Sequence, residues 1–221
     1  MDENGRETKS ADAVRQTYDQ IAGHFAKTRR YPWPEVESFV TAASGGDLGI
    51  DVGCGNGRHA ELLADRVNRV VGVDVSVGLL GEAIVRAREH GYQFEPVAGD
   101  AAALPLATGC ADLAVYVATL HHLPTREARI NSLDELARVL ALDGRALVSA
   151  WSTEHDRFDR EAGFDTTVDW TLPGGETVPR FYHVYDSEEF RKDIAASRLE
   201  LLEFEVSSGN CYATVTPGTS K

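Results

Sequence analysis

Cysteine, lysine and long apolar runs are scarce in this 221-residue sequence, and each scarcity excludes a class of protein. The three cysteines, Cys54, Cys110 and Cys211, are widely separated and form no CxxC pair, whereas zinc ligands normally come in close pairs. We therefore expect neither a metal site nor a disulfide framework. No apolar run approaches the ~20 residues that span a bilayer, and the polar first residues resemble neither a signal peptide nor a mitochondrial leader. These absences predict a cytoplasmic protein without a membrane segment.

Positive charge is also scarce, since the formal net charge is −13 and only four of the 22 basic residues are lysines. Acidic, lysine-poor surfaces stay hydrated at high salt, so this composition indicates a halophilic organism, with an ordinary acidic cytoplasmic protein as the alternative. A broad nucleic-acid-binding face is disfavoured, because releasing phosphate counterions requires a basic surface. An RNA substrate must therefore meet a local arginine cluster, a partner's positive surface, or both.

Strands and helices are expected to alternate along the middle of the chain. The expected strands are residues 48–52, 69–73, 93–98, 111–118 and 145–151, and the expected helices are residues 11–27, 35–43, 58–66, 77–90 and 126–140. A helix at 187–197 and a hairpin of strands at 199–206 and 211–215 follow. This order predicts a Rossmann-like α/β fold whose seven-stranded, mostly parallel sheet ends in a C-terminal antiparallel hairpin.

The domain organisation follows from the same pattern. Residues 1–10 are expected to be a disordered tail, and residues 11–221 a single domain. Within that domain, residues 11–45 should form N-terminal helices, and the polar stretch 152–186 should be an insertion or lid.

A glycine-rich loop from Asp51 to Gly57 joins the first strand to the next helix and is the strongest functional signal. Its glycines let the backbone approach a ligand closely, and the helix N-terminus offers free N–H groups. Asp74 ends the second strand, 21 residues after Gly53, where a carboxylate can accept hydrogen bonds from ribose hydroxyls.

The acid that precedes these glycines distinguishes between nucleotides. Asp51 would repel a pyrophosphate but attract the ammonium and sulfonium groups of S-adenosylmethionine. Asp100 ends the third strand and could hold the adenine amino group, while the N–H of Ala101 meets a ring nitrogen. The alternative is that Asp74 caps a helix and Asp100 a turn. The predicted cofactor contacts are Tyr18, Phe25, Asp51, Gly53, Cys54, Gly55, Asn56, Asp74, Val75, Asp100, Ala101 and Val117.

Several motifs resemble class I methyltransferases, and more closely the tRNA methyltransferases that methylate the carboxymethyl group of a wobble uridine. The motifs are Tyr18-Asp19-x-x-Ala22-x-x-Phe25-x-x-Thr28-Arg29, Pro32-Trp33-Pro34, the glycine loop, His121-His122 with Thr125-Arg126, Ala150-Trp151, and Arg180-Phe181-Tyr182-His183-Val184-Tyr185. The resemblance implies S-adenosylmethionine as cofactor, methyl-ester formation in a tRNA anticodon loop, and a small zinc-binding activator subunit. In that family the activator adds a strand beside the strand expected here at Gln93 to Ala98.

The chemistry implied by the resemblance needs no general base, because a carboxylate with a reference pKa near ~4 is already ionised at neutral pH. His121 and His122 follow the fourth strand and are therefore expected to position the substrate, or else to be packed structural histidines. Arg29, Arg180 and His183 are expected to bind the carboxylate or anticodon-loop phosphates, with ordinary surface residues as the alternative. Aromatic residues near the N-terminus are expected to close over the cofactor or stack on a base, although each could simply belong to the core. These are Tyr18, Phe25 and Trp33.

Two other functions remain open from the residues alone. One is methylation of a small molecule such as a quinone precursor, which the glycine loop does not exclude. The other is a non-catalytic subunit that binds the cofactor and acts as a scaffold.

Overall fold

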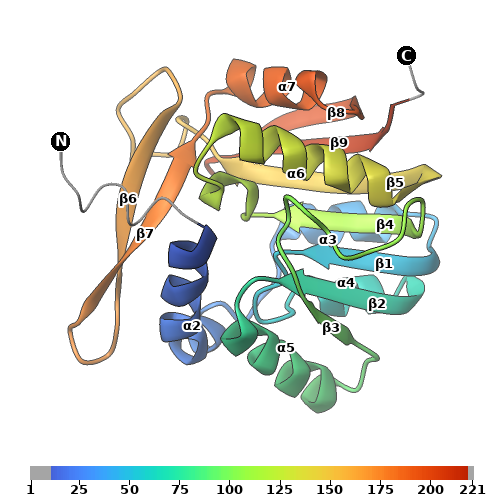
Figure 1. The fold of residues 1–221 in the computed structure, drawn as a ribbon, viewed down its shortest axis with the longest axis horizontal. Helices are drawn as coiled ribbons and strands as arrows, with labels where there is room; N and C mark the ends of the chain where they lie inside the picture. The colour runs from blue at the N-terminus through green and yellow to red at the C-terminus, as the bar shows by residue number, and fades with distance from the viewer. Residues whose placement is uncertain (1–10, 219–221) are drawn as a thin grey trace.

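A seven-stranded sheet forms the centre of the computed structural model, which describes residues 11–218 (Figure 1). Its strand order is β3-β2-β1-β4-β5-β9-β8. The strands are β1 (Gly46–Val52), β2 (Val67–Asp74), β3 (Glu95–Ala98), β4 (Ala111–Val117), β5 (Leu140–Trp151), β8 (Leu199–Ser207) and β9 (Asn210–Pro217). The first five run parallel, whereas β9 runs antiparallel to both β5 and β8. The expected Rossmann-like fold with a C-terminal antiparallel hairpin is confirmed.

Helices cover both faces of this sheet, as parallel strands require. The helices are α2 (Ala11–Thr28), α3 (Pro34–Ala42), α4 (Ala60–Ala64), α5 (Val77–His90), the 3-10 turn η1 (Leu120–His122), α6 (Arg126–Val139) and α7 (Ser187–Ala196). Leu133 of α6 and Phe190 of α7 belong to one core, and Val36 of α3 and Leu63 of α4 to the other. Figure 1 accordingly shows α6 in front of the sheet and α3 behind it.

The strand order changes direction at β1, which lies between β2 and β4. The chain therefore leaves β1 and β4 toward opposite sides, and a crevice opens at their carboxyl ends. Side-chain caps fix the helices that begin near this crevice. The Ser76 hydroxyl accepts a hydrogen bond from Leu79 N at the start of α5, and the Thr125 hydroxyl accepts one from Ala128 N at the start of α6.

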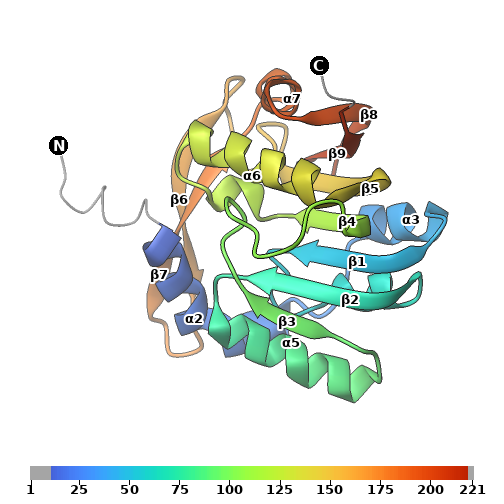
Figure 2. The ribbon, with the colours of Figure 1, turned by 45° about the vertical axis from the view of Figure 1, so that its right-hand side comes forward.

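Residues 164–184 form a separate two-stranded sheet, which the interpretation of a polar insertion did not predict. The strands are β6 (Phe164–Thr171) and β7 (Thr177–Val184), paired antiparallel. Figures 1 and 2 show this hairpin beside α2, at the edge of the molecule. In β6 every second side chain faces inward, with Val168 and Trp170 buried between exposed neighbours. This period of two is what a half-buried strand requires, although Asp and Thr occupy the outward positions.

Element boundaries differ from expectation at several places. The helix expected at 58–66 shortens to α4, and the strand expected at 145–151 begins earlier, at Leu140. The tail expected at residues 1–10 lies outside the described residues. Within residues 11–218, no helix is both long and apolar enough to cross a bilayer, and no cluster of His, Cys, Asp or Glu could hold a metal ion.

Candidate active site

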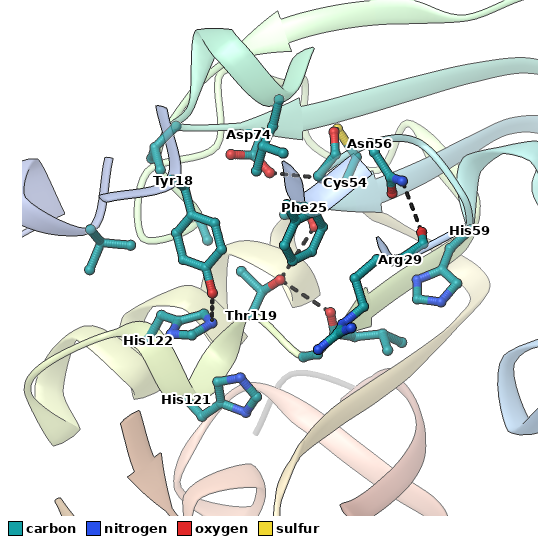
Figure 3. Close-up of a pocket in the computed structure, with 18 of the residues that line it drawn as sticks. Tyr18, Phe25, Arg29, Cys54, Asn56, His59, Asp74, Thr119, His121 and His122 are labelled. Atoms are coloured by element: carbon teal, nitrogen blue, oxygen red, sulfur yellow. Dashed lines mark hydrogen bonds between the residues drawn. The ribbon is translucent and has the colours of Figure 1, made fainter. Parts of the chain in front are cut away.

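A pocket opens at the carboxyl ends of β1, β2 and β4, and α2 and β7 close its sides. All but three of the residues that the sequence predicted for the site line this pocket. They are Tyr18, Phe25, Arg29, Gly53, Cys54, Gly55, Asn56, Asp74, Val75, Ala101, Val117, His121, His122 and Arg180. Figure 3 shows Tyr18 and His122 on one side of the pocket and Arg29 and His59 on the other. Asp51, Asp100 and His183 do not line it.

The glycine loop has the backbone conformation that its sequence suggested. Gly53, Gly55 and Gly57 all have positive φ, of 69°, 53° and 75°. A Cβ at Gly53 would collide with the side chain of Thr119, so that position admits only glycine. Gly53 N and Cys54 N both donate to Val73 O, at 2.7 and 3.1 Å, which holds the loop against the end of β2. The loop therefore forms a fixed wall of the pocket.

Asp74 is the acid that reaches the pocket wall. Its carboxylate is 8% exposed and accepts hydrogen bonds from Gly55 N and Ser76 N, both at 2.8 Å. Burial raises the pKa of Asp74 to about 6, although both N–H groups act in the opposite direction. Each oxygen accepts one backbone bond and has a further lone pair, which suits it to accept hydroxyl hydrogens from a ligand.

Asp51 lies beneath the loop and not on the pocket surface. It is 1% exposed, and its Oδ2 has no hydrogen-bond partner among the described residues. Burial and then the nearby charge of Asp74 raise the pKa of Asp51 to about 7. The two acids therefore form a buried pair that is easily protonated.

The structure places Asp100 in the turn after β3. Its Oδ1 accepts a hydrogen bond from Ala102 N at 2.8 Å, which is the turn-capping role considered from the sequence. Its neighbours Gly99 and Ala101 line the pocket instead. An adenine contact by the Asp100 side chain stays a prediction.

His122 is held on both sides and is neutral. Its Nδ1 lies 2.8 Å from Phe181 O, and its Nε2 lies 2.7 Å from the hydroxyl of Tyr18. A carbonyl only accepts, so Nδ1 carries the hydrogen and Nε2 accepts from the Tyr18 hydroxyl. Burial lowers the pKa of His122 to about 3. The Nε2 lone pair of His122 is already used and cannot take a proton from a substrate.

His121 has the opposite tautomer. Trp151 N donates to its Nδ1 at 3.0 Å, so the hydrogen of the neutral ring lies on Nε2. Burial, followed by the neighbouring His122 and Arg180, lowers the pKa of His121 well below its ordinary value. His121 therefore presents a hydrogen-bond donor rather than a base.

Arginines and aromatic rings complete the side of the pocket next to the histidines. The Arg180 guanidinium is 9% exposed and lies 4.8 Å from the centre of the Trp170 ring and 5.2 Å from that of Tyr182. Its Nε has no hydrogen-bond partner among the described residues. Tyr182 in turn stacks on Trp151, with ring centres 4.5 Å apart and planes inclined by 19°. A buried cation therefore stands between flat aromatic surfaces.

His183 does not line the pocket, and its contact with the substrate stays a prediction. Its two ring nitrogens lie 2.9 Å from Asp165 and 3.1 Å from Glu189. These acids belong to β6 and α7, so His183 connects the hairpin to the following helix. His183 lies three residues after Arg180 on β7, an odd separation that points the two side chains to opposite faces of the strand.

Sequence reasoning missed several pocket residues. Arg58 and His59 follow the glycine loop, and Thr119 follows β4. Arg58 lies over the Trp33 ring at 5.3 Å, and burial, then the charge of Arg29, lowers the pKa of Arg58 to about 10. The signal that could have found Arg58 and His59 was their place in the first turn after the loop, where side chains face the same crevice.

Comparison with known proteins identifies the family. Residues 50–144 match the model of a family described as a methyltransferase domain. The mouse protein named tRNA (carboxymethyluridine(34)-5-O)-methyltransferase ALKBH8 is 38% identical over 65% of this chain, and the Saccharomyces cerevisiae enzyme of that name is 33% identical over 81% of it. The aligned parts are 20% and 64% of those two proteins, so this chain spans about a fifth of the mouse relative. A protein of Encephalitozoon cuniculi named only as a methyltransferase is 31% identical, with 91% of this chain and 94% of that protein aligned.

Solved structures agree on the fold. The methyltransferase CcbJ of Streptomyces caelestis superposes with a TM-score of 0.74 at 20% identity, covering 92% of this chain and 98% of that one. A structure described as a complex between the Haloferax volcanii Trm112 methyltransferase activator and a methyltransferase superposes with a TM-score of 0.68 at 14% identity, covering 94% of this chain and 99% of that one. The chain has the glycine loop, the acid that ends β2, and similarity over nearly its full length to a methyltransferase. It therefore belongs to the S-adenosylmethionine-dependent methyltransferases of class I fold.

Proposed function

We propose that the chain transfers a methyl group from S-adenosylmethionine to the carboxymethyl group of a modified uridine at the tRNA wobble position, forming a methyl ester. The observation that carries this proposal is the absence of an available base on the histidine side of the pocket, among the described residues. His121 offers only an N–H there, and the lone pair of His122 Nε2 is taken by Tyr18. An acceptor that arrives already ionised, such as a carboxylate, is the kind that this lining can use.

The positive and donor groups of the same lining favour an anion. Arg180 supplies a buried guanidinium, and His121 supplies its Nε2–H, both toward the pocket. A guanidinium binds a carboxylate through parallel hydrogen bonds, which would also orient the attacking oxygen. The stacked rings of Trp151 and Tyr182 offer a flat wall for a uracil and exclude water from it.

The opposite side of the pocket fits S-adenosylmethionine. We assign Asp74 to the ribose hydroxyls and the loop from Gly53 to Asn56 to the methionine part, with Ala101 and Val117 beside the adenine. Asp51, buried below the loop with one unpartnered oxygen, gives this wall negative charge near the cofactor's cationic groups. When bound, the cofactor supplies an electrophilic methyl group on its sulfonium. The chain's own residues hold the acceptor oxygen in line with that methyl group.

We further propose that an activator subunit pairs with the free edge of β3. This strand is the outer strand of the sheet on that side, and three of its four residues are exposed. An exposed edge offers unpaired backbone groups to an added strand. The Haloferax volcanii complex supports such a partner for a protein of this fold. Hydrogen exchange tests the assignment, because the amides of residues 94, 95, 97 and 98 should gain protection when the activator is added (Pro96 has no N–H), and unchanged exchange there would contradict it.

Methyl transfer to tRNA tests the proposed reaction. The enzyme, co-expressed with the activator, is mixed with labelled cofactor and with tRNA from cells that lack the enzyme. We expect label in tRNA that mild alkali releases, as an ester requires. Label only in a small-molecule extract would favour a metabolite substrate, and no transfer at all would favour a scaffold.

A matched variant tests the carboxylate contact. Arg180→Gln should keep cofactor binding, because Arg180 lies on the acceptor side, but should reduce ester formation about a hundredfold or more, the scale of losing one charge-stabilising group. The kcat of the unaltered enzyme should stay flat between about pH 7 and 9, since no base titrates there. A rising limb in that interval would show that a base is needed, and would overturn the mechanism.

A further inference from the structure

The segment that joins α2 to α3 stands at the mouth of the pocket and is unusual in charge. Residues 20–34 contain no acid, although the whole chain has a net charge of −13. Three cations, Lys27, Arg29 and Arg30, are followed there by Tyr31. All four side chains are exposed, and Tyr31, at 81%, is among the most exposed large hydrophobic residues of the described chain. We call residues 27–31 the rim segment.

The outward side chains of the rim segment have no partners within residues 11–218. Lys27, Arg30 and Tyr31 make no side-chain hydrogen bond, ion pair or ring contact there. Cations elsewhere commonly meet a carboxylate, as Arg69 meets Glu95 at 3.0 Å and Arg138 meets Glu135 at 2.7 Å. In so acidic a protein, leaving neighbouring cations unpaired at one place concentrates positive potential there.

The backbone of the rim segment is nevertheless fixed to the pocket. Asn56 of the glycine loop donates to Arg29 O at 2.9 Å, and Arg29 N continues the helix by donating to Phe25 O at 2.9 Å. The side chains of Arg29 and Trp33 line the pocket on either side of the exposed pair. Arg30 and Tyr31 are thus held beside whatever enters the pocket.

We propose that the rim segment binds the anticodon-loop nucleotides next to the one in the pocket, with Lys27 and Arg30 on phosphates and Tyr31 stacked on a base. This inference rests on the proposed tRNA substrate, and it adds where the RNA strand on either side of the bound nucleotide contacts the protein. A nucleotide turned into a pocket leaves its neighbours and their phosphates at the mouth. Proteins bind single-stranded RNA with this combination of groups, because cations attract the phosphate backbone and an exposed aromatic ring can stack on any base.

Four single substitutions test the rim segment in the enzyme co-expressed with its activator. Arg30→Glu and Tyr31→Ala are compared with Tyr31→Phe, which keeps the ring, and with Arg88→Glu, an equal charge change. Arg88 is exposed in the last turn of α5 and does not line the pocket. The measurements are tRNA affinity at several salt concentrations, cofactor affinity, and kcat and KM for tRNA lacking the ester.

We expect Arg30→Glu to raise the tRNA KM on the order of tenfold, with kcat and cofactor affinity within about twofold. For Arg30→Glu, the slope of log affinity against log salt concentration should be smaller in magnitude by about 0.7, which is the contribution of one phosphate contact on a single strand. Tyr31→Ala should weaken binding roughly tenfold, and Tyr31→Phe should restore it. Arg88→Glu should bind tRNA as the unaltered enzyme does.

Three results would overturn the inference: unchanged tRNA affinity in Arg30→Glu and Tyr31→Ala, an equal loss in Arg88→Glu, or loss of the activator from the rim variants, which would make this a protein interface. The unaltered enzyme separates this inference from the proposed function. If it binds tRNA through the rim segment but forms no ester, the proposed reaction fails and the RNA surface stands. If it forms the ester while the rim variants bind normally, only the surface fails.

Discussion

At the scale of single residues, the two buried acids Asp74 and Asp51 should make cofactor binding sensitive to pH. Burial raises the pKa of Asp74 to about 6 and that of Asp51 to about 7 in the free protein. Protonated Asp74 cannot accept as readily from two ribose hydroxyls, and protonated Asp51 no longer attracts a cation. We therefore expect the dissociation constant of S-adenosylmethionine to rise as the pH falls from about 7.5 to about 5.5, measured by calorimetry. The Asp74→Asn protein should bind weakly at every pH, and a constant affinity over this interval in the unaltered protein would contradict the assignment.

The same acids affect the stability of the free protein in the opposite direction. Their pKa values are higher in the folded chain than the ordinary value of 3.8, so the folded state binds protons more tightly than the unfolded state. The stability that they contribute is present below about pH 4 and is lost as the pH rises through 6 and 7. Strong cofactor binding and maximal stability of this site therefore occur at different pH, as is common where charge is buried for function.

Removing the hydroxyl of Tyr18 should destabilise the fold through His122. In Tyr18→Phe the Nε2 of the buried His122 ring loses the hydrogen bond that it accepts at 2.7 Å. Leaving a buried acceptor unsatisfied costs about 1–3 kcal/mol, which urea unfolding would measure. Tyr31→Phe is the control, because its hydroxyl lies in solvent. Equal stability of both variants would show that this bond contributes nothing.

At the scale of elements, Trp170 joins the β6–β7 hairpin to α2. Its Nε1 donates to His24 Nδ1 at 2.9 Å, and its ring lies 5.7 Å from that of Phe25. We expect Trp170→Ala to lower the free energy of unfolding by about 3–5 kcal/mol, as for other buried tryptophans. Cofactor affinity should also fall, because α2 carries Tyr18 and Phe25 into the pocket.

Trp170→Phe distinguishes the contributions of ring and hydrogen bond. It keeps an aromatic ring against Phe25 but gives no donor to His24, so it should retain most of the cofactor affinity. Calorimetry with each variant at a temperature where both are folded separates affinity from stability. Unchanged affinity in Trp170→Ala would mean that the hairpin does not hold α2 over the cofactor.

The elements also show which signals a sequence carries. The helix at 77–90 was predicted to the residue, because Ser76 caps its start and Gly91 ends it with a φ of 76°. The hairpin of residues 164–184 was missed, because Asp and Thr at its outward positions made a strand resemble a polar loop. The place of Asp74 could be predicted from its sequence distance to the glycines. The place of Asp100 could not, because an acid in a turn can bond either its own backbone or a ligand, and packing that no local sequence pattern records decides between them.

At the scale of the whole molecule, net charge gives stability and RNA binding opposite responses to salt. With a charge of −13, self-repulsion opposes the compact state, and raising KCl from about 0.1 M to about 1 M shortens the screening length from about 10 Å to about 3 Å. The thermal midpoint should therefore rise with KCl at pH 7.5. Near pH 5 the rise should shrink, because the sequence pI is about 4.9 and little net charge remains to be screened.

The same salt displaces phosphates from the rim segment, so tRNA affinity should fall while the fold gains stability. Methylation measured against KCl should then pass through a maximum, and a midpoint that falls with salt at pH 7.5 would show that repulsion among the acids does not limit this fold.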